Sequence, residues 1–103
     1  MTIAAQVITR PLFTGTAHRI ELILWENKAT RTRFDMTGKT LKVRFQSIGV
    51  AVAEYTVVAT DATEGEGYFD LGTSHVNAGA CSGQITVDGQ ARDRFETELI
   101  ASI

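Results

Sequence analysis

The chain has 103 residues, of which 44% are hydrophobic and 21% are charged, and its formal net charge is −2. This length and apolar content suit one domain, residues 1–103, with a core of its own, and they exclude a chain that is disordered throughout. The slight negative charge and the scattered Lys and Arg side chains exclude the basic surface that nucleic acids require, so no nucleic-acid partner is expected.

The single cysteine, Cys81, excludes an internal disulfide and is typical of a protein made in a reducing cytoplasm. Residues 1–6 lack the basic segment and apolar run of a signal peptide. No apolar stretch reaches the length of a membrane span, so no membrane partner is expected.

Apolar and polar residues alternate with a period of two, which predicts strands. Residues 3–9 predict an edge strand that ends before Pro11. In the next strand, residues 18–25, Ile23 and Trp25 add apolar side chains to the face opposite Ile20, Leu22 and Leu24. Either a loop of the same chain or another subunit covers that second face.

Further strands are predicted at residues 41–46, 53–58, 67–71, 84–87 and 94–100. Asp88-Gly89 predicts a tight turn between the last two. Residues 73–79 predict one helical turn, capped by Thr73 or Ser74 and closed by Gly79. About seven short strands without long helices predict an all-β sandwich.

Four pieces of the chain resemble the N-terminal immunoglobulin-like domain of tailed-phage upper baseplate and receptor-binding proteins. They are residues 35–45 (DMTGKTLKVRF), residues 61–69 (DATEGEGYF), Ala78-Gly79, and residues 84–97. The resemblance spans roughly residues 15–100 and implies an immunoglobulin-like antiparallel β-sandwich. The chain departs from the family where Met36 replaces the usual Leu and where Cys81 and Ser82 replace an aromatic residue.

The resemblance implies a non-enzymatic structural protein of a tailed-phage virion, made in the host cytoplasm. We expect a baseplate or tail attachment module that docks onto a symmetric assembly, with other phage structural proteins as partners and a homo-oligomer or ring as its state. A head decoration protein is one alternative, and a carbohydrate-binding or adhesion module is another. Fibre-type family members continue into helical or trimeric segments, whereas this sequence stops at Ile103, so a fibre is not expected.

No catalytic, cofactor or metal site is predicted. His18, His75 and Cys81 supply three zinc ligands without a ligand-like spacing, and both histidines are expected in turns or at the surface. Cys81 is interpreted as a small buried residue. The acidic residues 61–66 lack the spacing of a calcium loop. Ser74 and Ser82 lack the frame of a hydrolase nucleophile, and Tyr68 is expected inside, with its hydroxyl bonded to the backbone.

Apolar residues near both ends of the chain, together with Ile23 and Trp25 on the second face of the strand at residues 18–25, are the candidate interface. An apolar strand edge is a site for β-augmentation by a neighbouring subunit, although both ends can instead pair inside one sandwich. The candidate interface residues are Ile3, Val7, Ile23, Trp25, Leu99, Ile100 and Ile103.

Overall fold

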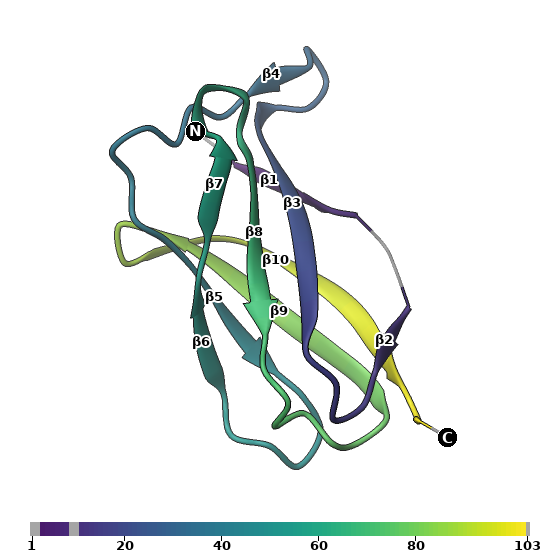
Figure 1. The fold of residues 1–103 in the computed structure, drawn as a ribbon. Helices are drawn as coiled ribbons and strands as arrows, with labels where there is room; N and C mark the ends of the chain where they lie inside the picture. Colours follow the sequence, from purple (N-terminus) through teal and green to yellow (C-terminus); the bar gives the residue numbers. More distant parts are fainter. Residues whose placement is uncertain (1–2, 9–10, 103) are drawn as a thin grey trace.

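The computed structural model describes residues 3–8 and 11–102, which form two five-stranded sheets packed face to face (Figure 1). One sheet holds β1 (Ala4–Val7), β3 (His18–Asn27), β4 (Thr32–Arg33), β7 (Val58–Asp61) and β8 (Glu66–Leu71). The other holds β2 (Leu12–Phe13), β5 (Leu41–Gln46), β6 (Ala53–Thr56), β9 (Gly79–Val87) and β10 (Gln90–Ile100). A 3₁₀ turn, η1 (Ala62–Glu64), joins β7 to β8.

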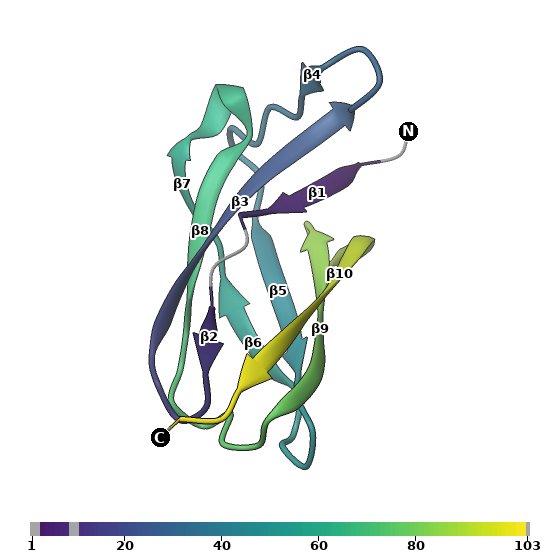
Figure 2. The ribbon, with the colours of Figure 1, turned by 90° about the vertical axis from the view of Figure 1, so that its right-hand side faces the viewer.

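The strand order is that of an immunoglobulin-like sandwich, as the resemblance implied. The first sheet runs β1-β3-β8-β7, with β4 on β3, and the second runs β2-β10-β9-β5-β6. Neighbouring strands are antiparallel except β2 and β10, which pair in parallel through Leu12 with Leu99 and Phe13 with Ile100. The chain leaves the first sheet after β1 and joins the second as β2, which Figure 2 shows from the side.

The core lies between the sheets because alternate side chains of every long strand point inward. β3 contributes Ile20, Leu22 and Leu24, and β5 contributes Leu41, Val43 and Phe45, all buried as predicted. The strands β8, β9 and β10 add further side chains to this core: Phe69, Leu71, Cys81, Ile85, Val87, Phe95 and Leu99.

Two predicted elements are wrong. The single strand expected at 53–58 is two strands, because the chain crosses from one sheet to the other at Val57. Residues 73–79 form no helical turn. His75 points inward there, and its carbonyl accepts a hydrogen bond from the Gly15 amide rather than from a residue four positions along a helix.

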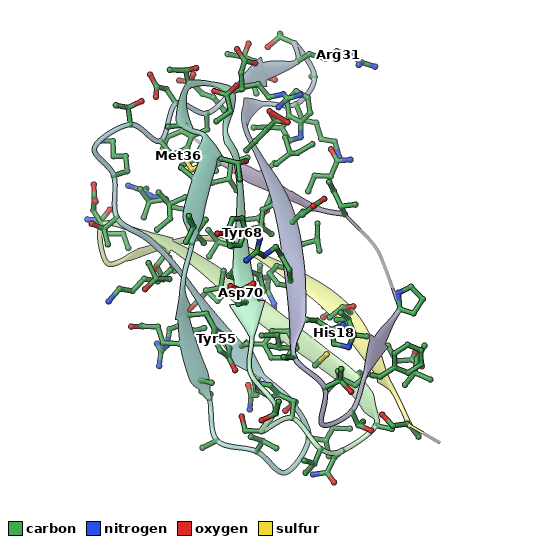
Figure 3. All side chains as sticks on the ribbon, viewed as in Figure 1. His18, Arg31, Met36, Tyr55, Tyr68 and Asp70 are labelled. Carbon is green, nitrogen blue, oxygen red and sulfur yellow. The ribbon has the colours of Figure 1, made fainter. Side chains whose placement is uncertain are left out.

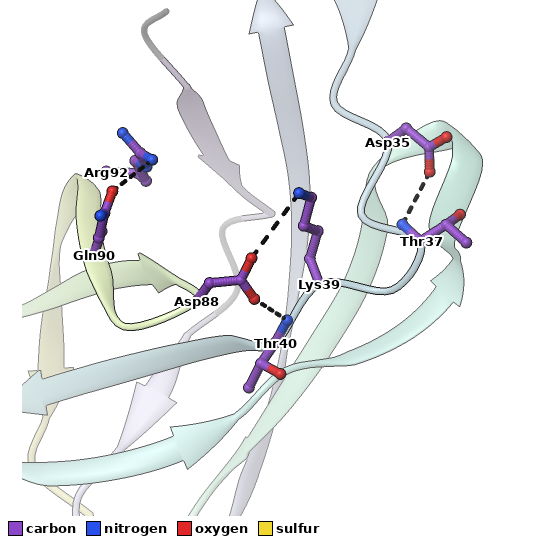
Figure 4. A network of polar contacts seen from close by, with 7 residues as sticks. All are labelled: Asp35, Thr37, Lys39, Thr40, Asp88, Gln90 and Arg92. Atoms are coloured by element: carbon purple, nitrogen blue, oxygen red, sulfur yellow. Dashed lines mark hydrogen bonds and ion pairs between the residues drawn. The ribbon is translucent and has the colours of Figure 1, made fainter.

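The predicted Asp88-Gly89 turn is present, with φ of 49° and 82°. The Asp88 carboxylate also fastens the start of β5, because it accepts a hydrogen bond from the Thr40 amide at 2.9 Å and lies 4.0 Å from Lys39 Nζ (Figure 4). Asp35 opens the turn before β5 by accepting from the Thr37 amide at 2.9 Å, and hydrogen bonding to Thr37 lowers the pKa of this carboxyl.

Candidate functional site

Three loops and the last described residues meet at one end of the sandwich, the lower end in Figure 1. We call residues 14–17, 47–52, 72–78 and 101–102 the uncharged end, because they include no Asp, Glu, Lys or Arg. Hydrogen bonds join the segments: Gly15 N donates to His75 O at 2.9 Å, Asn77 Nδ2 to Ile48 O at 2.7 Å, and Ser102 Oγ to Thr14 O at 2.7 Å. The end is therefore one connected surface.

Large apolar side chains are exposed on this surface. Ile48 is 53% exposed, Val52 47% and Val76 60%. At its margin, the parallel β2–β10 pair adds Phe13 and Ile100, which are 41% and 45% exposed. Depletion of charge together with exposed apolar side chains is the compositional mark of the centre of a protein–protein interface.

The opposite end differs sharply in charge. Its loops run between β3 and β5, between β7 and β8, and between β9 and β10, and Figure 3 shows Arg31 at its tip. The charged residues within these loops are Lys28, Arg31, Arg33, Asp35, Lys39, Glu64 and Asp88. The loops at this end thus carry charged side chains, whereas the four described segments of the uncharged end carry none.

A buried polar cluster lies beneath the uncharged end. His75 is 1% exposed, and its Nδ1 lies 2.6 Å from Ser47 Oγ while its Nε2 lies 2.8 Å from Tyr55 Oη. Tyr55 Oη also accepts a hydrogen bond from the Gly72 amide at 3.3 Å. The Phe45 ring and the imidazole form a T-shaped pair, with the centroids 4.9 Å apart and the ring planes at 72°. Burial lowers the pKa of His75, so the ring is neutral at neutral pH.

This cluster has a structural role rather than the geometry of a hydrolase. Ser47 is 4% exposed, and a nucleophile has to reach its substrate. Both ring nitrogens of His75 are taken up by hydroxyl groups, with no carboxylate in the position that orients the histidine of a catalytic triad. Through these hydrogen bonds the cluster connects the loops 47–52 and 72–78 to β6.

The prediction that His75 is a surface or turn histidine is wrong in its exposure. The residue lies in a polar turn, Thr73 to Gly79, that has no period to indicate an inward position. Its partners Ser47 and Tyr55 are 28 and 20 positions away in the sequence. No local signal could have placed these three side chains together.

The other sequence-predicted features have different outcomes. His18 Nε2 accepts a hydrogen bond from the Phe13 amide at 2.9 Å, and the two rings are 6.2 Å apart. Tyr68 is not inside: it lies on the outer face of its sheet, with the Arg19 guanidinium 3.8 Å from its ring centre. The tyrosine whose hydroxyl reaches the backbone is Tyr55.

Cys81 is buried, as expected. Burial raises the pKa of its thiol, and the negative charge of the nearby Glu98 raises it further. In the described part of the chain, no three His, Cys, Asp or Glu side chains lie close enough to hold a metal ion. In the same described residues, the 3₁₀ turn η1 is the helical segment, and it is far too short to cross a membrane.

The predicted interface residues are divided between core and surface. Ile3 and Leu99 are 4% and 1% exposed and belong to the core: Ile3 precedes β1, which pairs with β3, and Leu99 lies on β10, which pairs with β9. They are therefore not available to a partner, and the same holds for Trp25, which is 9% exposed. Ile103 lies outside the described residues, which leaves Val7, Ile23 and Ile100 of the predicted set.

Trp25 is covered by side chains of its own chain rather than by another subunit. Its indole Nε1 donates to Gln6 Oε1 at 3.1 Å, and the Arg33 guanidinium lies 4.6 Å from the ring centre. Val7 and Ile100 instead border a groove of about 750 Å³, with Arg19, Glu96 and Glu98 also lining it.

Comparisons of this chain with protein-family models, with curated proteins and with solved structures find no match.

Proposed function

We propose that this protein is a non-enzymatic structural module of a tailed-phage particle, and that it docks onto a symmetric assembly through its uncharged end. The observation that carries the docking role is the lack of charged side chains in four segments that meet at one end. Ile48 and Val76 are exposed on this end, at 53% and 60%. The phage context rests on the resemblance of residues 35–45 and 61–69 to the baseplate family.

The size of the end favours attachment in many copies. The Cα atoms span 41 × 23 × 21 Å, so the cross-section at one end of the sandwich is roughly 500 Å², whereas a stable pairwise interface buries about 800 Å² of accessible surface per partner. A single contact of that size is weak. Repetition around a symmetric particle makes weak contacts effective through avidity.

The copy number in purified particles of the encoding phage tests the proposed location. Quantitative mass spectrometry against the major capsid protein should give the few copies of a ring or two, in keeping with a baseplate or tail module. A copy number close to that of the capsid protein would make it a head decoration protein instead. Absence from particles would contradict the virion role altogether.

Charge placed at the uncharged end should abolish docking. Val76→Asp adds a carboxylate to a 60% exposed position, where it must be desolvated in the docked state. We expect at least a tenfold loss of incorporation into particles, measured by complementation of a deletion phage, with little change in the thermal stability of the isolated chain.

Val58→Asp is the matched control for this substitution. Val58 is also exposed, at 47%, but it lies on the edge strand β7 and outside the uncharged end. It should be incorporated like the wild type. Equal incorporation of the two variants would contradict docking through the uncharged end.

A further inference from the structure

We propose that His75 is an acid-sensitive latch, whose protonation loosens the loops 47–52 and 72–78 at the uncharged end. The inference about the loops concerns the isolated fold, whereas its effect on docking rests on the proposed function.

His75 forms hydrogen bonds with three other segments of the chain, and for this reason we call it a latch. Its two ring nitrogens contact Ser47 at the start of the loop 47–52 and Tyr55 on β6. Its backbone carbonyl accepts from Gly15 in the loop before β3. Beside it, Gly72 N donates to Tyr55 Oη and Asn77 Nδ2 to Ile48 O, so the loop 72–78 is fastened at its start, centre and end.

Among the described residues, no charged side chain forms a hydrogen bond or ion pair with the imidazole that would stabilise its protonated form. Its hydrogen-bond partners are the hydroxyl groups of Ser47 and Tyr55, and its ring packs against that of Phe45. The loops 14–17, 47–52 and 72–78 and the strand β9 carry no charged side chain. On the other strands nearby, alternation places the charged residues on the outer faces of the sheets: Lys42 and Arg44 on β5, Glu54 on β6, Glu66 and Asp70 on β8.

Outer-face ion pairs occupy several of those charges. Lys42 lies 3.3 Å from Glu54, and Asp70 lies 2.9 Å from Arg19. The other histidine, His18, sits at the edge of the same end and contacts Phe13 rather than the cluster. A proton added to His75 therefore places a positive charge in a buried site where its hydrogen-bond partners are two hydroxyl oxygens and no carboxylate.

The direction of the pH effect follows from burial. Burial lowers the pKa of His75 below its usual 6.5, so the released, solvated loop binds the proton more readily than the closed one. Above about pH 6.5 the free energy that favours the closed loop over the released loop is fully present. It decreases as the pH falls below 6.5 toward the lowered pKa of the buried ring. The population of the released loop rises about tenfold for each unit between the two pKa values.

Hydrogen exchange of the isolated chain, read by NMR between about pH 7.5 and pH 4.5, tests the latch. After correction for intrinsic exchange, protection of the Gly15 and Gly72 amides should fall by about tenfold or more on acidification. Protection of Ile85 in the middle of β9 should remain. Protection at Gly15 and Gly72 that is independent of pH would overturn the proposal.

Two histidine variants assign the effect. His75→Gln removes the titrating ring, so the pH-dependent step should disappear, whereas His18→Gln should retain it. A step that persists in His75→Gln, or that vanishes in His18→Gln, would overturn the assignment.

If His75→Gln does not fold, the wild-type chain still decides the question. The midpoint of loop release must then match the titration of the His75 ring, followed by its carbon-bound protons, and a match to His18 instead would refute the latch. Because these experiments use the isolated chain, their failure is distinct from a failure of particle docking.

Discussion

Replacing Gly65 with alanine is expected to lower the free energy of unfolding by about 2–4 kcal/mol, the sum of a backbone term and a packing term. Gly65 has φ of 67°, in the left-handed region that a Cβ disfavours. A Cβ at this position would also lie 2.5 Å from the Leu24 carbonyl oxygen and 2.8 Å from that of Phe34. Both are backbone atoms held in place: Leu24 lies on β3, Phe34 N donates to Leu24 O at 3.0 Å, and Gly65 O itself accepts from Leu24 N at 2.8 Å.

Gly38→Ala separates the two terms. Gly38 has nearly the same φ, 73°, but nothing lies within 4 Å of a Cβ placed there. It should cost about 1 kcal/mol, from backbone strain alone. Denaturant unfolding of both variants measures the difference. Equal losses would mean that the close approach of Gly65 to β3 and Phe34 contributes nothing, contrary to this account.

The strands could be predicted because their signal is local. In residues 18–25 and 41–46, inward and outward positions alternate in the sequence itself, and the structure buries Ile20, Leu22, Leu41 and Val43 accordingly. The turn at Asp88-Gly89 is equally local, because two residues with positive φ have a distinctive composition. Together these elements are sufficient to indicate a sandwich.

The uncharged end could not be predicted in the same way, although the lack of charged residues in each of its segments can be read from the sequence. Loops 14–17, 47–52 and 72–78 are each unremarkable, and only the sheet topology brings them to one end. The apolar residues near the chain ends were the predicted interface instead. Two of these, Ile3 and Leu99, are apolar because they belong to the core. An apolar residue near a chain end does not by itself show which side of the sheet it faces.

Phe69→Ala should be more damaging still, with an expected loss of about 3–5 kcal/mol in the free energy of unfolding. Phe69 is fully buried on β8, with its ring centroid 5.9 Å from that of Tyr55 and 6.3 Å from that of Phe95. Alanine leaves a cavity between the sheets that rigid neighbouring strands cannot close. Since domains of this size have about 5–15 kcal/mol of stability, the variant should melt far below the wild type.

Phe13→Ala is the matched control, because it deletes the same atoms from a side chain that is 41% exposed. It should cost about 1 kcal/mol or less, since surface substitutions rarely cost more. The comparison also tests the orientation of β8. If Tyr68 rather than Phe69 faced the core, Phe69→Ala would be mild and Tyr68→Ala severe. The register of β3 with β8, which pairs Ile20 with Phe69, requires the opposite.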